Sequence, residues 1–127
     1  MAALNVEQGR AVKGYDVVAY FTDGQPVKGS PRFSVRWRGA TWQFASAGHR
    51  AAFRHMPDRY APRYGGYCAF AASQGRIVDI DPRRWKTEDG HLYLNANRLA
   101  HFLWLRDPAG HIRKGDAFWR TVPQREL

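Results

Sequence analysis

The residues on either side of Gly39 constrain the fold more than any other part of the chain. From Phe33 to Trp37 every second side chain is large and apolar, and the alternation returns at Trp42 and Phe44. Because neighbouring side chains of a strand point to opposite faces, this pattern gathers the apolar side chains on one face. With a glycine at the turn, the sequence predicts a β-hairpin whose apolar face packs against other elements.

The flanks of this hairpin predict an extended segment before it and a helix after it. Residues 14–21 are rich in β-branched and aromatic side chains, which favours an extended conformation. Ser46 is a good N-cap for a helix that runs through Met56 and is terminated by Pro57.

The second half of the chain predicts elements of the same kinds. Residues 85–94 form a second predicted hairpin around a glycine, and Asn97 caps a helix that Pro108 stops. A last short helix is predicted over residues 112–119. Together these elements indicate an α+β fold in which small antiparallel β-hairpins pack against three or four short helices.

A chain of 127 residues has the size of one domain. We expect this domain to cover residues 12–121, after a polar lead-in at residues 1–11 and before a C-terminal tail at residues 122–127.

A weak internal similarity is also present. Residues 39–46 and 90–97 both run from a glycine through a strand to a capping residue, a pattern that either a duplication or an ordinary hairpin-to-helix connection would produce.

Charge and composition exclude several classes of function. The formal net charge of +9 suggests nucleic acid as a partner, but the basic residues are scattered and no nucleic-acid motif is present, so we expect no specific nucleic-acid binding. The chain has no apolar run long enough to span a membrane. Its N-terminus lacks the pattern of a signal peptide, which predicts a cytoplasmic protein, or a periplasmic one if the chain is a mature or trimmed form.

Residues 60–75 hold the most chemical groups in the shortest length. Gly65 and Gly66 permit a tight turn, and Cys68, the single cysteine, follows at the start of a short helix. A thiol there lies near the positive end of the helix dipole and near Arg63, and both positive charges favour the thiolate form. The alternative is equally consistent with the sequence: a lone cysteine among alanines is often a small buried apolar residue.

His49 is the histidine with the most informative position. It lies four residues before Phe53 and seven before Met56, so it shares the apolar face of the predicted helix, as a ligand or as a core histidine with its hydrogen bonds satisfied. The irregular spacing of the three histidines in the second half predicts surface positions for His91, His101 and His111.

Several motifs in order resemble those of the YHS-domain proteins, in their small single-domain bacterial subgroup. The similarity covers residues 12–120. It is carried by Gly-Tyr-Asp-Val-Val-Ala-Tyr-Phe at 14–21, Trp-Gln-Phe-Ala-Ser at 42–46, Pro-Asp-Arg-Tyr-Ala-Pro at 57–62, Tyr-Gly-Gly-Tyr-Cys-Ala at 64–69, Asp-Ile-Asp-Pro at 79–82, Leu-Tyr-Leu-Asn at 92–95 and Asp-Ala-Phe-Trp at 116–119. The resemblance implies a small α+β domain that binds a transition metal ion, copper being the ion often proposed.

The chain departs from the cysteine-bearing members of the family. Where their modules carry Asp-Pro-Val-Cys and Phe-Cys-Ser, this chain has alanine in place of each cysteine, at Ala19 and Ala45, and His49 stands where they have a further cysteine. Soft metals prefer thiolate or imidazole ligands. A copper or zinc site would therefore need a mixed set drawn from Asp16, His49, Cys68 and the nearby tyrosines.

A second kind of site is a small-molecule pocket. Its predicted walls are tyrosines and the glycine turn, with Asp16 as the carboxylate; the alternative is that the tyrosines pack in the core. The predicted ligand-binding residues are Tyr15, Tyr20, Tyr64, Gly65, Gly66 and Tyr67.

The leading functional hypothesis is a non-catalytic module that binds a metal ion or a small ligand. No paired carboxylates, nucleophile elbow, phosphate loop or zinc-protease motif is present, which disfavours an enzyme. The alternatives are a thiol-based redox enzyme that uses Cys68 without metal, and a basic accessory protein that acts through its surface charge.

Overall fold

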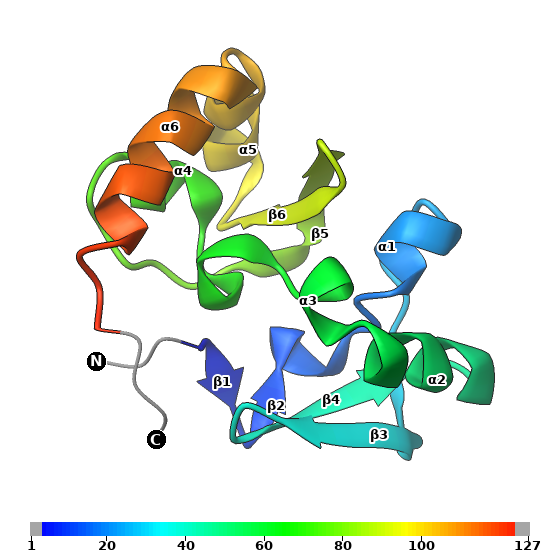
Figure 1. Ribbon diagram of the computed structural model, residues 1–127. Helices are drawn as coiled ribbons and strands as arrows, with labels where there is room; N and C mark the ends of the chain where they lie inside the picture. Colours follow the sequence, from blue (N-terminus) through cyan, green and yellow to red (C-terminus); the bar gives the residue numbers. More distant parts are fainter. Residues whose placement is uncertain (1–3, 124–127) are drawn as a thin grey trace.

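The computed structural model describes residues 4–123 as two small sheets covered by short helices (Figure 1). Its elements in chain order are β1 (Val6–Glu7), β2 (Arg10–Ala11), the 3₁₀ turn η1 (Val12–Gly14), α1 (Ala19–Thr22), β3 (Ser30–Trp37), β4 (Ala40–Phe44), α2 (Ala47–His55), α3 (Pro57–Tyr60), the 3₁₀ turn η2 (Arg63–Gly66), α4 (Ala69–Ser73), β5 (Asp81–Glu88), β6 (His91–Asn95), α5 (Arg98–Leu105) and α6 (Pro108–Trp119). The α+β class predicted from the sequence is confirmed.

Both predicted hairpins are present. β3 and β4 pair antiparallel, with Val35 opposite Trp42, inside a sheet of strand order β1-β2-β4-β3. β5 and β6 form a separate antiparallel pair in which Thr87 lies opposite Leu92. The predicted capping residues Ser46 and Asn97 each accept a hydrogen bond from a backbone N–H in the first turn of their helix.

The predicted extended segment over residues 14–21 is wrong in its second half: Tyr15 is extended and forms an antiparallel bridge with Lys28, but the chain then turns into α1. Val17, Val18, Ala19 and Tyr20 are all buried, so these residues have no polar face of the kind that a half-buried strand shows. Residues 6–11 are more than a polar lead-in, since β1 and β2 pair with each other and β2 extends the sheet.

The helical content is also larger than the sequence indicated. α1 occupies the segment expected to be extended, and α3 follows directly after Met56. α6 starts at Pro108, four residues earlier than residue 112, because the side chain of Asp107 accepts a hydrogen bond from Gly110 N–H and caps the helix. Residues 1–3 and 124–127, from the predicted lead-in and tail, lie outside the described residues.

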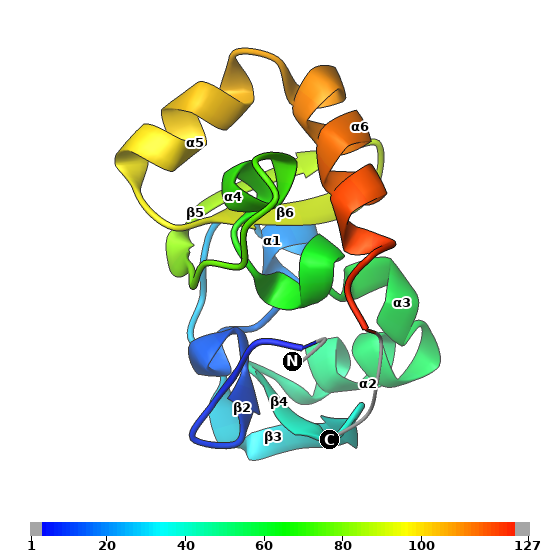
Figure 2. The ribbon, with the colours of Figure 1, turned by 90° about the vertical axis from the view of Figure 1, so that its left-hand side faces the viewer.

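The weak internal similarity extends over almost the whole chain. At a period of about 50 residues, η1, α1, β3, β4, α2 and α3 recur as η2, α4, β5, β6, α5 and α6. We call residues 12–60 the first repeat and residues 64–119 the second repeat. The two occupy different parts of the molecule, with the α4, α5 and α6 helices on the opposite side from the first sheet (Figure 2).

Unusual backbone details match between the repeats. Three consecutive residues have positive φ in each 3₁₀ turn: 50°, 52° and 81° from Val12 to Gly14, and 60°, 62° and 79° from Tyr64 to Gly66. Positive φ is uncommon outside glycine, so two runs of this kind at the same place are not a consequence of ordinary secondary structure. Each hairpin also has a break in register near its start, between residues 30 and 34 and between residues 81 and 85.

The main hydrophobic core contains residues from both repeats. Trp42, Phe44 and Phe53 of the first repeat belong to the same buried cluster as Leu92 and Leu94 of the second. α1 crosses to the second hairpin, where the Tyr20 ring packs at 5.3 Å from Trp85 and its hydroxyl donates to the Pro82 carbonyl at 2.6 Å. The repeats therefore share one core, although a smaller cluster around Tyr93 and Trp104 lies under α4, α5 and α6.

In residues 4–123, every helix is too short or too polar to cross a membrane.

Candidate functional site

Asp16 is fully buried and fixes the first repeat by four hydrogen bonds. Its Oδ1 accepts from the backbone N–H groups of Val18 and Ala19 at 2.9 and 3.1 Å, at the start of α1. Its Oδ2 accepts from Ala45 N–H at 2.9 Å and lies 2.7 Å from His49 Nδ1. A buried carboxylate is stable only when its oxygens have such partners.

The structure thus brings together two of the predicted site residues, Asp16 and His49. The His49 Nδ1 atom donates to the carboxylate, and its Nε2 lies 3.3 Å from the Thr22 hydroxyl and 3.9 Å from Asp23 Oδ1. His49 is on the inner side of α2 with the buried Phe53, whereas Met56, which was predicted to share that face, is exposed. Both ring nitrogens of His49 therefore already have polar neighbours.

Cys68 occupies the position in the second repeat that Asp16 has in the first. The N–H of Asp16 donates to Val27 O and the N–H of Cys68 donates to Val78 O, at 2.8 and 2.9 Å. The Cys68 Sγ caps α4 by accepting from Ala71 N–H at 3.5 Å, and it accepts from Ala96 N–H at 3.3 Å. The side chain is buried, and a thiol replaces the carboxylate at the same structural position.

Asn95 completes this second cluster, and the sequence analysis did not select it. Its Oδ1 accepts from Phe70 N–H at 2.9 Å and from the Cys68 thiol at 3.5 Å. Its Nδ2 lies 3.4 Å from His101 Nδ1. The signal in the sequence was an amide side chain at a strand position where the equivalent residue of the first repeat, Phe44, is apolar. In the structure this amide is fully buried.

His101 is partly buried beside Asn95, so the prediction that it lies at the surface is only partly right. Burial, with the nearby charges of Arg84 and Lys86, lowers the pKa of His101 below its ordinary value of 6.5. A neutral ring can accept from the Asn95 amide at Nδ1. His111, also predicted to be at the surface, is partly buried, with its Nδ1 3.0 Å from Ser73 Oγ.

A metal centre built from Asp16, His49 and Cys68 does not fit these arrangements. Asp16 and His49 bond each other, whereas the polar neighbours of the Cys68 sulfur are Asn95, Ala71 and Ala96. Across residues 4–123 no group of three or more His, Cys, Asp or Glu side chains is placed to hold a metal ion, whereas zinc or copper needs three or four ligands. Copper or zinc binding stays a prediction of the family resemblance.

Two of the predicted tyrosines, Tyr20 and Tyr64, are buried, and two, Tyr15 and Tyr67, are partly buried. Tyr20 is buried, and burial raises its pKa well above the usual range. Tyr64 donates to Asp116 Oδ1 at 3.0 Å and packs against α6 at Gly115. Tyr15 and Tyr67 are partly buried, Tyr67 with its ring 6.3 Å from that of Trp119.

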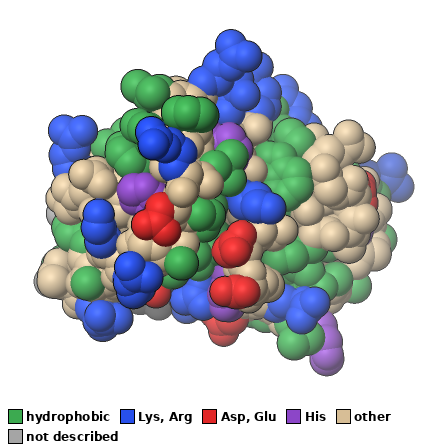
Figure 3. All heavy atoms as spheres, turned by 90° about the horizontal axis from the view of Figure 1, so that it is seen from above, with side chains coloured by type: hydrophobic (Ala, Val, Ile, Leu, Met, Phe, Trp, Pro, Cys, Tyr) green, Lys and Arg blue, Asp and Glu red, His purple; other side chains and the backbone are tan. Residues whose placement is uncertain are grey.

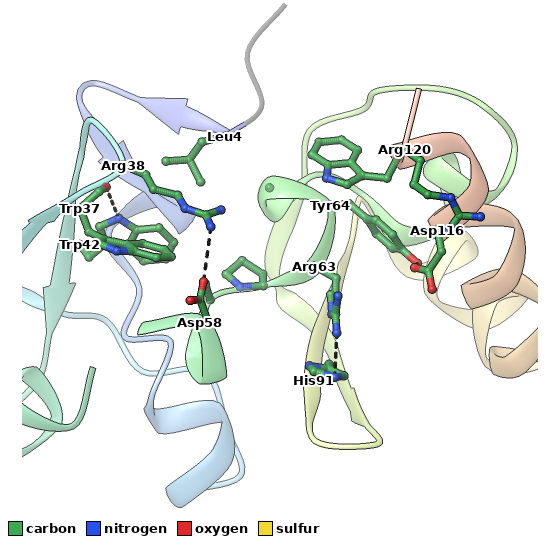
Figure 4. A pocket seen from close by; sticks show the side chains of 14 residues that line it. Leu4, Trp37, Arg38, Trp42, Asp58, Arg63, Tyr64, His91, Asp116 and Arg120 are labelled. Carbon is green, nitrogen blue, oxygen red and sulfur yellow. Dashed lines mark hydrogen bonds and ion pairs between the residues drawn. The ribbon is translucent and has the colours of Figure 1, made fainter. Parts of the chain in front are cut away.

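A cleft of about 490 Å³ lies between the two repeats, within the range usual for ligand pockets (Figure 4). Its lining includes two predicted ligand-binding residues, Tyr64 and Gly65. The other lining residues are Leu4, Trp37, Arg38, Trp42, Asp58, Ala61, Pro62, Arg63, His91, Asp116, Trp119 and Arg120. We call this space the inter-repeat cleft.

The walls of the inter-repeat cleft are aromatic, and positive side chains outnumber negative ones along them. Three arginines line it against two aspartates. Asp58 pairs with Arg38 at 3.4 Å, and Asp116 accepts from Tyr64. Arg63 donates instead to the neutral acceptor His91 Nε2, at 2.8 Å (Figure 4).

His91 stays neutral at pH 7 because burial and the adjacent Arg63 charge lower its pKa. Among the described residues no carboxylate lies within ion-pair distance of Arg63. The guanidinium is therefore held in place by a group that leaves its charge uncompensated, a combination suited to an anion.

We expect Asp16→Asn to lower the free energy of unfolding by about 3 kcal/mol, because the amide nitrogen would face the donors Ala45 N–H and His49 Nδ1. Urea denaturation at pH 7 measures this change. Asp58→Asn is the control: its side chain is 83% exposed, and the change should stay within about 0.5 kcal/mol. Equal effects of the two variants would contradict the role given to Asp16.

We expect the Cys68 thiol to react with Ellman's reagent about a hundredfold more slowly in the native protein than in urea, because the sulfur is buried. Stopped-flow absorbance at pH 7.5 gives both rates. Native reactivity close to that of the unfolded chain would instead support the thiol-redox alternative.

We expect the protein to lose stability as the pH falls from 7.5 to 5.5. His101 has a lower pKa in the folded than in the unfolded state, so acid protonates the unfolded chain first and favours unfolding. Urea denaturation at both pH values should show a smaller loss for His101→Gln than for wild type or for the exposed-site control His55→Gln. The same loss in all three proteins would exclude this role of His101.

Comparison of the chain with family models, with curated proteins and with solved structures finds no match. The resemblance to the YHS-domain proteins therefore stays a prediction from the motifs, and the site is argued from the chain's own residues.

Proposed function

We propose that this protein is a non-catalytic binding module that holds a small organic anion in the inter-repeat cleft. The observation that carries the proposal is the Arg63 guanidinium, which lies in an aromatic-walled cleft with a neutral histidine as its partner. A carboxylate or phosphate group forms two parallel hydrogen bonds with such a guanidinium.

The aromatic walls define the rest of the ligand. Trp37 and Trp42 line one side of the cleft from the first repeat, and Tyr64 and Trp119 line the other from the second. Trp42 and Tyr64 are buried, so the partly exposed rings of Trp37 and Trp119 offer the surface for a planar or apolar part of the ligand while its charged group reaches Arg63. Binding of this kind would bridge the two repeats.

The polar groups of the cleft favour holding a ligand over converting it. Each candidate acid or base already bonds a neighbour: Asp58 bonds Arg38, Asp116 bonds Tyr64, and His91 bonds Arg63. A general acid or base must instead be within reach of the proton that it transfers. These contacts support a binding role.

We expect benzoate or phenyl phosphate to bind saturably in isothermal titration at pH 7, and the neutral analogue benzyl alcohol to bind at least about tenfold more weakly. Arg63→Gln should weaken binding of the anions about 10- to 100-fold, because a charge-assisted hydrogen-bonding partner is removed. Arg63→Lys should give an intermediate loss, since lysine keeps the charge and loses the planar geometry.

Arg59→Gln is the matched control, because Arg59 is an exposed arginine nearby in the sequence that does not line the cleft. It removes the same charge from the chain and should leave the affinity unchanged. Equal weakening by Arg59→Gln and Arg63→Gln would mean that net charge alone attracts the anions, and absence of saturable binding by either anion would refute the proposal.

A further inference from the structure

The outer face of α5 exposes three large apolar side chains. Leu99, Phe102 and Leu105 are 65%, 60% and 40% exposed. Their spacing of three residues places them along one side of the helix, while Ala100 and Trp104 are buried on the other side. We call these three residues the apolar stripe.

The first repeat supplies an internal comparison for this stripe. α2 is the equivalent helix, and the N-caps Ser46 and Asn97 align the two helices. The positions of the stripe correspond to Gly48, Ala51 and Arg54, which are exposed as well. The same fold therefore does not require large apolar residues there. A contiguous set of them at the surface is typical of a contact site.

Basic side chains lie at both ends of the stripe and on the elements next to α5. Arg98 and Arg106 are exposed at the two ends of α5, and Arg113 and Lys114 are exposed on α6, which packs against α5. On the other side Arg84 and Lys86 of β5 are close enough to His101 to act on its charge. Asp107, the acidic residue between the two helices, accepts a hydrogen bond from Gly110 N–H.

The view from above shows hydrophobic side chains next to Lys and Arg side chains, with some Asp and Glu side chains nearer the middle of the view (Figure 3). The whole chain carries a formal net charge of +9, and Arg98 and Arg106 are exposed at the two ends of α5. The surface around α5 is therefore complementary in charge to an anionic surface.

We propose that α5 docks this protein onto the surface of an anionic phospholipid bilayer. Leu99, Phe102 and Leu105 enter the boundary between headgroups and acyl chains, and Arg98 and Arg106 contact the lipid phosphates. A short helix lying in the interface binds through its apolar side chains together with electrostatic attraction to anionic lipids.

Two features favour lipid over a protein partner. A second copy of this chain docked on the same face would bring like-charged arginines together, which opposes association. A rigid protein partner would also need carboxylates arranged to match the exposed Arg98 and Arg106, whereas lipid headgroups diffuse laterally to meet them.

Vesicle sedimentation of the full chain tests the proposal. At 100 mM salt we expect binding to vesicles of equal parts phosphatidylglycerol and phosphatidylcholine, and at least about tenfold weaker binding to phosphatidylcholine alone. Leu99→Gln/Phe102→Gln should lower the partition coefficient on the anionic vesicles by about tenfold or more, because the inserted apolar groups are lost. Circular dichroism checks that the variant keeps its fold.

Met56→Gln is the matched control, since Met56 is another exposed large apolar residue, outside α5, and its partition coefficient should stay within about twofold of wild type. Binding that is equal in wild type and the double variant would overturn the proposal, because surface charge alone would then explain it. Absence of binding to anionic vesicles, or a wild-type dimer that the double variant abolishes, would also overturn it.

Discussion

The buried carboxylate of Asp16 is the interaction on which the first repeat depends. It joins the start of α1 to the residue after β4 and to the ring of His49 on α2, which lie 29 and 33 residues further along the chain than Asp16. In the second repeat Cys68 and Asn95 share the same task, with a sulfur and an amide oxygen in place of the carboxylate. Two different chemical solutions thus support one backbone arrangement.

This division of tasks supports the proposed location of the ligand site. The groups that the family motifs would assign to a metal bond each other or the backbone, so they stabilise the repeats. Arg63 differs, because its hydrogen-bond partner His91 is neutral. The hydrogen bond fixes the orientation of the guanidinium and leaves its charge without a counterion among the described residues. This contrast supports the proposal of a ligand site in the inter-repeat cleft.

Local patterns predicted the hairpins and the two capped helices, because alternation, turn glycines and capping residues act over a few positions. The helical conformation of residues 19–22 could not be predicted in this way, since the carboxylate that caps α1 also depends on Ala45 and His49, far along the chain. Periodicity similarly selected His49 but could not distinguish a ligand from a partner of Asp16.

The cleft was partly predictable. Tyr64 and Gly65 were selected as ligand-binding residues from the glycine turn, and both line the cleft. Trp37 and Trp119 belong to elements at opposite ends of the chain, and His91 was expected at the surface, so no local pattern connects them. Only the packing of one repeat against the other brings these residues together.

The five tryptophans offer the most direct test of the central claim, that the inter-repeat cleft is the ligand site. Trp37, Trp42 and Trp119 line the cleft, whereas Trp85 and Trp104 do not. Proton–nitrogen correlation spectra, with the indole signals assigned by single Trp→Phe variants, follow all five during a titration with phenyl phosphate. The account predicts saturable shifts of the three cleft indoles and little change in the other two. Shifts confined to Trp85 and Trp104, or spread evenly over all five, would contradict it.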